Sequence, residues 1–113
     1  MFSWFQIHVV LVFHQHSYER SHVIKNGQVV TTEKGALSAG THQGTIYLIG
    51  GKTGGTDYQD STPRLSQCNW VNTYKHLSES AATYNVITAT ATSFELSAKN
   101  VDGTSIDHFV ITK

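Results

Sequence analysis

The last third of the sequence contains three runs of residues that alternate between polar and apolar side chains. They are TYNVITATA at residues 83–91, SFELSAKN at 93–100 and SIDHFVITK at 105–113, separated by Thr92 and by the turn VDGT. A period of two predicts β-strands, and such short connections predict that successive strands are antiparallel neighbours. We therefore expect residues 80–113 to form a C-terminal antiparallel β meander.

The middle run indicates how this meander is oriented. Its residues fall on two faces of a strand, Phe94, Leu96 and Ala98 on one and Ser93, Glu95 and Ser97 on the other. An antiparallel sheet with one apolar and one polar face packs one side against a core and leaves the other side in water. We expect this arrangement for the meander.

The segments before the meander also carry strand signals. Phe5–Phe13 is apolar at both odd and even positions, which predicts a strand covered on both sides. Val23–Val30 places Asn26-Gly27 between two apolar pairs, a strong hairpin signal. Thr45–Ile49 predicts a short strand that runs into a glycine-rich loop at Gly50–Gly55.

Residues 56–80 show no clear period. They are polar and contain the only proline, Pro63, so we expect a long loop with a helical turn from Trp70 to Leu77. The pattern predicts no long amphipathic helix anywhere in the chain, so the expected fold class is mostly β. The candidate core aromatics are Trp4, Trp70, Tyr74 and Tyr84.

Composition narrows the function classes. With 113 residues the chain fits one domain or a piece of a larger one, and its 8 Lys plus Arg balance its 8 Asp plus Glu. A neutral chain lacks the electrostatic footprint of a protein that binds nucleic acid or an anionic membrane. The N-terminal apolar stretch is too short to span a bilayer and has neither a basic start nor a cleavage site. The sequence leaves the localisation unknown.

Histidine is unusually frequent, with seven in the chain, and His14 and His16 directly follow the Phe5–Phe13 run. Imidazole is the commonest metal ligand in proteins. Two imidazoles at i and i+2, where a strand turns into a loop, can reach two neighbouring metal ions. Spacing alone equally allows polar loop histidines. Four other histidines are expected to be polar loop or strand residues, namely His8, His42, His76 and His108.

The string VVLVFHQHSYERS, residues 9–21, resembles the last motif of the calcineurin-like metallophosphoesterases, most closely their purple-acid-phosphatase-like branch. In that motif a hydrophobic strand is followed by Gly-His-x-His, an aromatic residue and Glu-Arg. GTIYLIGGKTGG resembles the family's strand that ends in a Gly-Gly loop, and the three alternating runs resemble its C-terminal strands. The resemblance covers nearly the whole chain, Ile7–Lys113.

The resemblance implies a domain organisation. Residues 1–113 would be a single partial domain, the C-terminal part of a metallophosphoesterase α/β (αββα) sandwich that ends in the antiparallel meander. Residues 5–22 would be the strand and the metal-motif loop, and residues 80–113 the C-terminal meander.

The resemblance also implies a chemistry. The family hydrolyses phosphate monoesters or diesters at a two-metal centre, with Fe, Zn and Mn as candidate ions. By resemblance His14 would ligate one metal, and His16 would ligate the other or contact its substrate side. The candidate substrate-side residues are Tyr18, Arg20, Gly50 and Gly51. The residues themselves leave open an ion pair, a packed ring and a plain tight turn for these four.

The chain departs from the family pattern in two ways. The family's earlier motifs, Asp-x-His, Gly-Asp-x-x-Asp or -Tyr, and Gly-Asn-His-Glu or -Asp, are absent from the sequence, and Phe13 stands where the family has glycine. Two imidazoles cannot hold a dinuclear centre. We therefore assign no catalytic residue, expect the chain alone to be inactive, and leave open whether it binds a metal.

Two other interpretations remain open. The first is a non-catalytic β interaction module that keeps a relic of the motif. The second is a carbohydrate-binding β-sandwich, whose signature would be a set of exposed aromatic side chains. If the chain is a partial domain, we expect it to associate with itself through an exposed strand or apolar face.

Overall fold

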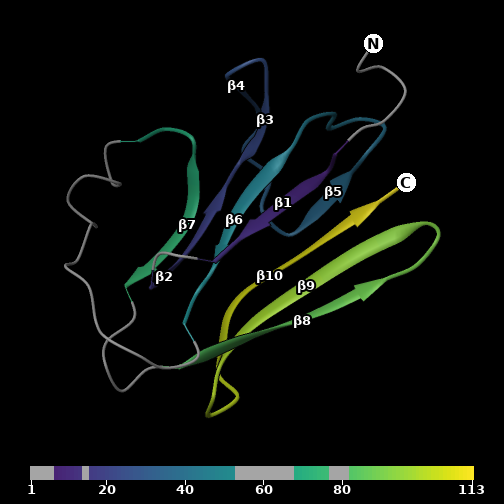
Figure 1. The fold of residues 1–113 in the computed structure, drawn as a ribbon. Coiled ribbons are helices and arrows are strands. Elements are labelled where there is room, and N and C mark those ends of the chain that lie inside the picture. The colour runs from purple at the N-terminus through teal and green to yellow at the C-terminus, as the bar shows by residue number, and fades with distance from the viewer. Residues whose placement is uncertain (1–6, 14–15, 53–67, 77–81) are drawn as a thin grey trace.

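The computed structural model describes residues 7–13, 16–52, 68–76 and 82–113, and for residues 74–76 the backbone alone. These residues form strands and no helix, as the sequence predicts (Figure 1). Within the described ranges no helix has the length and apolarity that crossing a bilayer requires.

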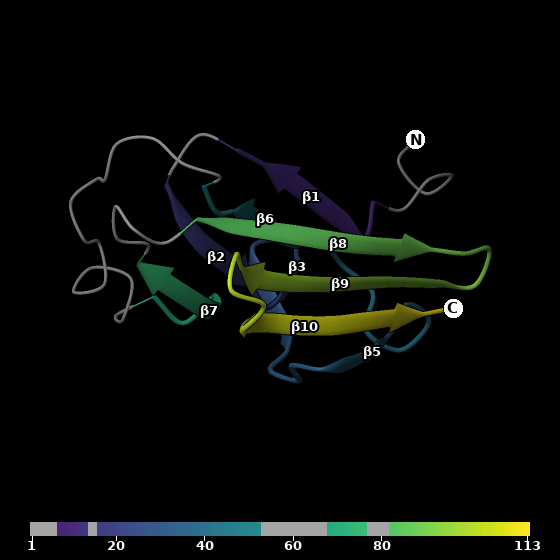
Figure 2. The ribbon, with the colours of Figure 1, turned by 90° about the horizontal axis from the view of Figure 1, so that it is seen from below.

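Two four-stranded sheets and a hairpin make up the fold. The mixed sheet has the order β1 (Val9–Val12), β6 (Ile46–Gly50), β2 (Ser17–Ser21) and β7 (Val71–His76). The tail sheet has the order β5 (Ala36–Ser38), β10 (Ser105–Thr112), β9 (Ser93–Asn100) and β8 (Thr83–Ala89). The hairpin consists of β3 (Val23–Lys25) and β4 (Gln28–Thr31). Figure 2 shows the tail sheet lying across the mixed sheet as a second layer.

The C-terminal meander is confirmed. β8 pairs with β9 and β9 with β10, both antiparallel, and β5 adds in parallel to the far edge of β10. Leu96 and Ala98 are buried and Phe94 packs against the same core, so the apolar face of β9 points inward as expected. A register shift between Ser105 and Asp107 interrupts the β9–β10 ladder.

The predicted hairpin is also confirmed. β3 and β4 are antiparallel and joined by Asn26-Gly27. Asn26 has φ of 51° and Gly27 has φ of 74°. Positive φ at both central residues is the geometry of a type I′ turn, which matches the twist of the flanking strands. Residue type at the turn therefore determines this element.

The strand predicted from Phe5–Phe13 is shorter and less covered than expected. β1 pairs in parallel with β6 and forms an edge of the mixed sheet. Val9 and Leu11 pack against the core, whereas Val12 is 48% exposed. The expectation of cover on both sides is wrong for the described residues, because the alternate side chains of this edge strand point away from the tail sheet.

The helical turn expected from Trp70 to Leu77 is wrong. Val71–His76 forms strand β7, which pairs antiparallel with β2, and Leu77 lies outside the described residues. The backbone of β7 forms a ladder of hydrogen bonds with β2. Such long-range pairing outweighs a weak local preference for a helical turn. The prediction of core aromatics is wrong for two residues, because Trp70 is 44% exposed and Tyr84 is 40% exposed. Trp4 lies outside the described residues, as does the side chain of Tyr74.

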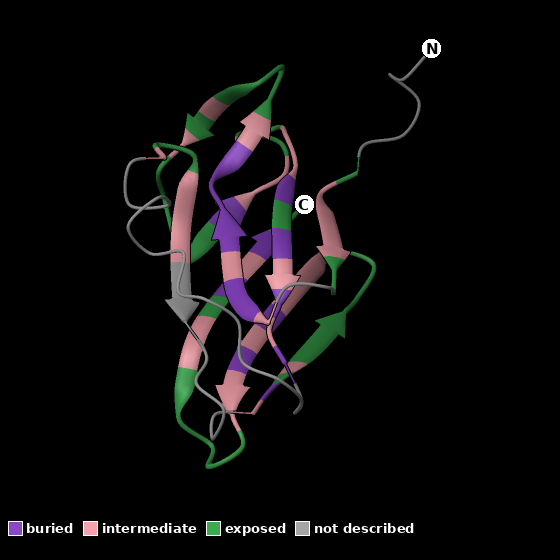
Figure 3. Cartoon of the chain, turned by 60° about the vertical axis from the view of Figure 1, so that its left-hand side comes forward, coloured by how far each residue is buried: buried purple, intermediate pink, exposed green. Residues whose placement is uncertain are grey.

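The core lies between the two sheets, where Figure 3 shows the buried residues gathered on the central strands. β2 and β6 provide it from one layer, and β9 and β10 from the other. Its largest buried apolar side chains are Tyr18, Ile46, Leu48, Leu96 and Phe109. β2 is a central strand of the mixed sheet, and it begins directly after His16, which the sequence predicts to be a metal ligand.

Candidate functional site

The carboxyl ends of β1 and β6 lie together. These two strands are parallel, and their register pairs Val12 with Ile49. The segment that follows β1 contains the His-x-His pair, and the residues at the end of β6 are Gly50 and Gly51. Loops that follow parallel strands at one edge are where open sheets form binding sites. The fold thus brings the start of the metal motif and the glycine pair to the same edge of the mixed sheet.

The two histidines of the motif differ in what can be said of them. His14 lies outside the described residues. His16 is partly buried and directly precedes β2. Their predicted metal-ligating roles stay predictions.

Phe13 and Gly50 fit against each other. The Phe13 side chain is 65% exposed, but one edge of its ring lies over Gly50, where an added Cβ atom would collide with it. The carbonyl of Gly50 accepts a 2.7 Å hydrogen bond from Asn85 Nδ2 on β8. Glycine at position 50 therefore makes room for the ring of Phe13.

A buried polar cluster joins β2 to β10 of the tail sheet. Arg20 on β2 donates from Nε to Asp107 Oδ2 at 2.6 Å and from Nη2 to Oδ1 at 2.9 Å. Tyr18, two residues earlier, donates its hydroxyl to Asp107 Oδ2 at 2.7 Å. The Arg20 and Asp107 side chains are only 1% and 9% exposed. We call these three residues the Asp107 cluster.

The surroundings of this cluster explain its electrostatics. The Arg20 guanidinium lies 4.6 Å from the centre of the Phe109 ring, a cation–π contact. Within the described structure, Arg20 Nη1 has no hydrogen-bond acceptor. Burial, with the negative charge of Asp107 as the second cause, raises the pKa of the Tyr18 hydroxyl far above its usual range. Tyr18 is therefore a permanent donor to Asp107.

The four candidate substrate-side residues fall into two groups. Tyr18 and Arg20 point into the core and bind Asp107, which is the packed ring and ion pair that the sequence left open. Gly50 and Gly51 lie at the edge where β1 and β6 end, and Gly51 has φ of 92°, which favours glycine. Substrate contact stays a prediction for all four.

Asp107 is the residue that sequence reasoning missed. A signal was present, because Asp107, Phe109 and Ile111 recur at every second position and the latter two are core residues. A carboxylate in phase with core residues needs a buried cation or donor. What the pattern could not supply was the partner, since Arg20 precedes it by 87 positions.

His22 and His42 have structural partners. His22 is buried, with Nδ1 3.3 Å from Asn72 Nδ2, and its pKa is lowered by burial and then by the charges of Lys34 and Arg20. His42 Nδ1 accepts from the Ser38 backbone N–H at 3.1 Å.

Of the remaining three histidines, His108 is placed as expected, whereas His76 lies in strand β7 instead of the predicted loop. His108 lies 2.8 Å from Glu95 in the exposed ladder of the tail sheet, so the expected hydrogen-bonded strand histidine is confirmed. His8 directly precedes β1, and the side chain of His76 is outside the described residues.

The described residues offer few metal ligands. Among them, no three His, Cys, Asp or Glu side chains lie close enough to hold one metal ion. His16 supplies a nitrogen donor of the kind that Zn or Fe accepts. The described residues therefore hold no complete metal site by themselves.

Comparison with known proteins gives a structural match. No family model matches the sequence. No curated protein matches it either. A purple acid phosphatase isolated from yellow lupin (Lupinus luteus) seeds matches in structure with a TM-score of 0.68 and 22% identity. The two share a fold.

The extent of this match is asymmetric. It covers 93% of this chain but 17% of the lupin protein. The shared region is a C-terminal β part of the purple acid phosphatase fold. At 22% identity the match establishes the fold, and the activity of the whole lupin protein enters only as a proposal.

Proposed function

We propose that this chain is the C-terminal part of a metal-dependent phosphohydrolase, which would hydrolyse phosphate monoesters or diesters. The supporting observation is that the parallel strands β1 and β6 end together, with the His-x-His segment after one and Gly50-Gly51 after the other. The fold shared with a purple acid phosphatase supports the same proposal.

In this proposal the chain supplies one side of a two-metal centre. His14 and His16 would hold Fe, Zn or Mn ions, which when bound polarise the phosphoryl oxygen and provide a hydroxide nucleophile. Neutral imidazoles add no charge, so the carboxylates that balance the metals would come from the rest of the domain. The chain by itself would be inactive.

In this proposal the Asp107 cluster would hold β2 in position next to His16. β2 begins directly after His16, and both Tyr18 and Arg20 on this strand are bound to Asp107. Residues 1–113 would thus be one partial domain, with residues 5–22 as the strand and metal-motif loop. The meander at residues 80–113 would hold that loop in place, because Asp107 on β10 binds Tyr18 and Arg20 on β2.

The proposal also concerns what contacts β1. Ile7, Val12 and Phe13 are exposed on and beside this edge strand, and we call them the β1 patch. Within the described residues β1 pairs only with β6. An apolar edge strand of this kind invites pairing with further polypeptide. We propose that the rest of the domain covers it, and that isolated chains associate through it.

The test is recombination. The DNA upstream of the Met1 codon would be sequenced, and any polypeptide encoded there that carries Asp-x-His, Gly-Asp-x-x-Asp or -Tyr and Gly-Asn-His-Glu or -Asp would be co-expressed with this chain. The proposal predicts metal-dependent hydrolysis of p-nitrophenyl phosphate by the pair, lost in His14→Ala and His16→Ala and kept in His108→Gln. Absence of such codons would contradict it.

The alternative is a non-catalytic β interaction module that retains a relic of the motif. Phe13 in the glycine position is the observation that favours it, because its ring lies against Gly50 at the very edge where the motif loop begins. This alternative predicts that Zn²⁺ and Mn²⁺ leave the melting temperature of the chain unchanged.

A further inference from the structure

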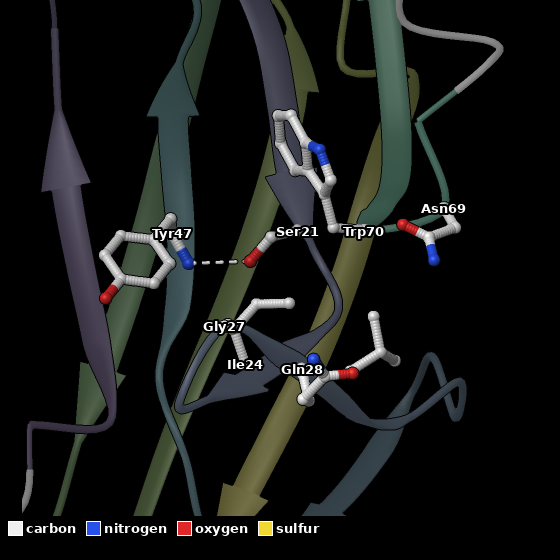
Figure 4. A pocket seen from close by; sticks show the side chains of 8 residues that line it. Ser21, Ile24, Gly27, Gln28, Tyr47, Asn69 and Trp70 are labelled. Carbon is white, nitrogen blue, oxygen red and sulfur yellow. Dashed lines mark hydrogen bonds between the residues drawn. The ribbon is translucent and has the colours of Figure 1, made fainter.

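A groove beside the carboxyl end of β2 has the composition of a ligand site. It measures about 270 Å³ and lies between β6, the end of β2, the β3–β4 hairpin and the segment before β7. Figure 4 shows the side chains that line it. The groove is separate from the β1 patch, and ligand binding there is independent of the proposed phosphohydrolase function.

Two aromatic rings contribute to this groove. Tyr47 is 52% exposed because its neighbours Ile46 and Leu48 occupy the core side of β6. Trp70 is anchored through its backbone, whose carbonyl accepts from the His22 N–H at 2.8 Å, while its indole remains nearly half exposed. Tyr47 and Trp70 both line the groove, and exposed aromatic side chains favour packing against a ligand.

The floor and rim of the groove are preformed. Ile24 and Val29 of the hairpin give it apolar surface. The Ser21 hydroxyl is already engaged, because it accepts from Tyr47 N at 2.9 Å and donates to the His22 carbonyl at 2.6 Å. These bonds fix the Tyr47 backbone beside Ser21, as the dashed line in Figure 4 shows.

Two carboxamides supply the exposed polar groups. Gln28 and Asn69 both line the groove and both are exposed, and Figure 4 shows them near its rim. Each carboxamide offers both a donor and an acceptor. Hydroxyl groups need this combination, since each hydroxyl donates once and accepts as well.

The charge of the lining selects the class of ligand. Among the described residues that line the groove, none is charged. Phosphate and carboxylate ligands would find no cation there, and a pure hydrocarbon would leave the carboxamides unused. A neutral ring that presents C–H groups on one face and hydroxyls around its edge satisfies both the aromatic rings and the carboxamides.

We propose that this groove binds a neutral carbohydrate, with a pyranose ring stacked on Trp70 or Tyr47 and its hydroxyls bonded to Gln28 and Asn69. The aromatic rings supply most of the contact area, and the carboxamides set the orientation. The ligand is a short neutral oligosaccharide, and acidic sugars are excluded by the absence of a cation in the described lining.

The test uses the full chain and tryptophan fluorescence. In a Trp4→Phe background Trp70 is the sole tryptophan, so its emission reports the groove directly. The probes are maltohexaose, cellohexaose, xylohexaose and chitotetraose, with the anionic oligogalacturonide as a charge control. At least one neutral probe is expected to change the emission in a saturable way in the low millimolar range, and the oligogalacturonide is not.

Variants assign the effect to the groove, with binding followed by saturation-transfer NMR. Tyr47→Ala and Trp70→Ala should each weaken binding of that probe at least tenfold, and Gln28→Ala about fivefold. Tyr84→Ala is the matched control, because Tyr84 is similarly exposed but lies on β8, and it should bind as the parent does. Gln28 is exposed at the start of β4, so this variant keeps the test valid if the aromatic variants lose their fold.

The proposal is overturned if no neutral probe binds in the low millimolar range. It is also overturned if Tyr84→Ala weakens binding as much as Trp70→Ala does, since stacking would then lie elsewhere. Equal binding of the oligogalacturonide would overturn the charge argument. If no probe binds and Trp70 also resists quenching by acrylamide, Trp70 is shielded from solvent. That result would overturn the proposal in favour of a groove that polypeptide covers.

Discussion

Replacing Asp107 by asparagine tests the Asp107 cluster most sharply. The substitution keeps the shape of the side chain but removes the charge that faces Arg20, whose side chain is 1% exposed. It also changes the acceptor of the Tyr18 hydroxyl. Breaking a buried ion pair from one side leaves an uncompensated charge and costs about 3–5 kcal/mol. We expect a loss of about 4 kcal/mol in the free energy of unfolding.

The assay is equilibrium unfolding in urea, followed by far-UV circular dichroism. With a slope of about 2 kcal/mol per molar urea, the expected loss lowers the midpoint by about 2 M without changing the slope. Glu95→Gln is the matched control. It breaks the His108–Glu95 pair on the neighbouring strands of the same sheet, and because both side chains are about half exposed it should cost less than about 1 kcal/mol.

A double-mutant cycle completes the test. Arg20→Met and Asp107→Leu should each be strongly destabilising, but the double variant buries no lone charge and should recover at least about 2 kcal/mol relative to the sum of the two. If the two effects add within about 0.5 kcal/mol, or if Asp107→Asn costs no more than Glu95→Gln, the cluster does not join the sheets as described.

Three further outcomes are expected. Because the folded-state pKa of Tyr18 is raised, the unfolded chain loses this proton first, so Tyr18 should leave stability unchanged up to about pH 10 and lower it above that pH. Tyr18→Phe should flatten this alkaline fall in pH-dependent urea titrations. Because the folded-state pKa of His22 is lowered, the unfolded chain takes up this proton first, so stability should fall below about pH 6.5, and His22→Gln should reduce the slope. Gly50→Ala should lower the melting temperature, because the added Cβ atom collides with the Phe13 ring, and adding Phe13→Gly should restore most of the loss. Equal melting temperatures of the single and double variants would refute the contact.

The elements that sequence patterns predicted are those fixed by local chemistry. Asn26-Gly27 determines the hairpin by its own backbone preference, and the alternating tail determines the meander by its face polarity. Both signals act over a few residues, so they are readable without knowledge of the rest of the fold.

The elements that were misread depend on distant partners. β7 is a strand because β2 offers it a ladder, and no pattern within residues 70–77 reveals that pairing. The exposure of Trp70 follows from the same cause, since its segment lies beside the hairpin rather than in the core. The strand signal of β1 was right, but its edge position could be known only from the sheet order.

The candidate site divides in the same way. The convergence of the motif segment with Gly50-Gly51 follows from the parallel pairing of β1 and β6, which the sequence could not show. The binding of Tyr18 and Arg20 to Asp107 spans 87 to 89 positions and needs the folded chain. The metal-ligating roles of His14 and His16 come from motif resemblance alone.

The most direct test of the central claim is a Zn²⁺ titration of the ¹⁵N-histidine-labelled chain, followed by imidazole NMR shifts. A metal motif predicts that the rings of His14 and His16 shift together, at lower Zn²⁺ than those of His42 and His108, and that His16→Ala removes both responses. If all histidines shift in parallel, or if His14 and His16 respond last, the metal-ligating roles proposed for His14 and His16 in this chain are contradicted.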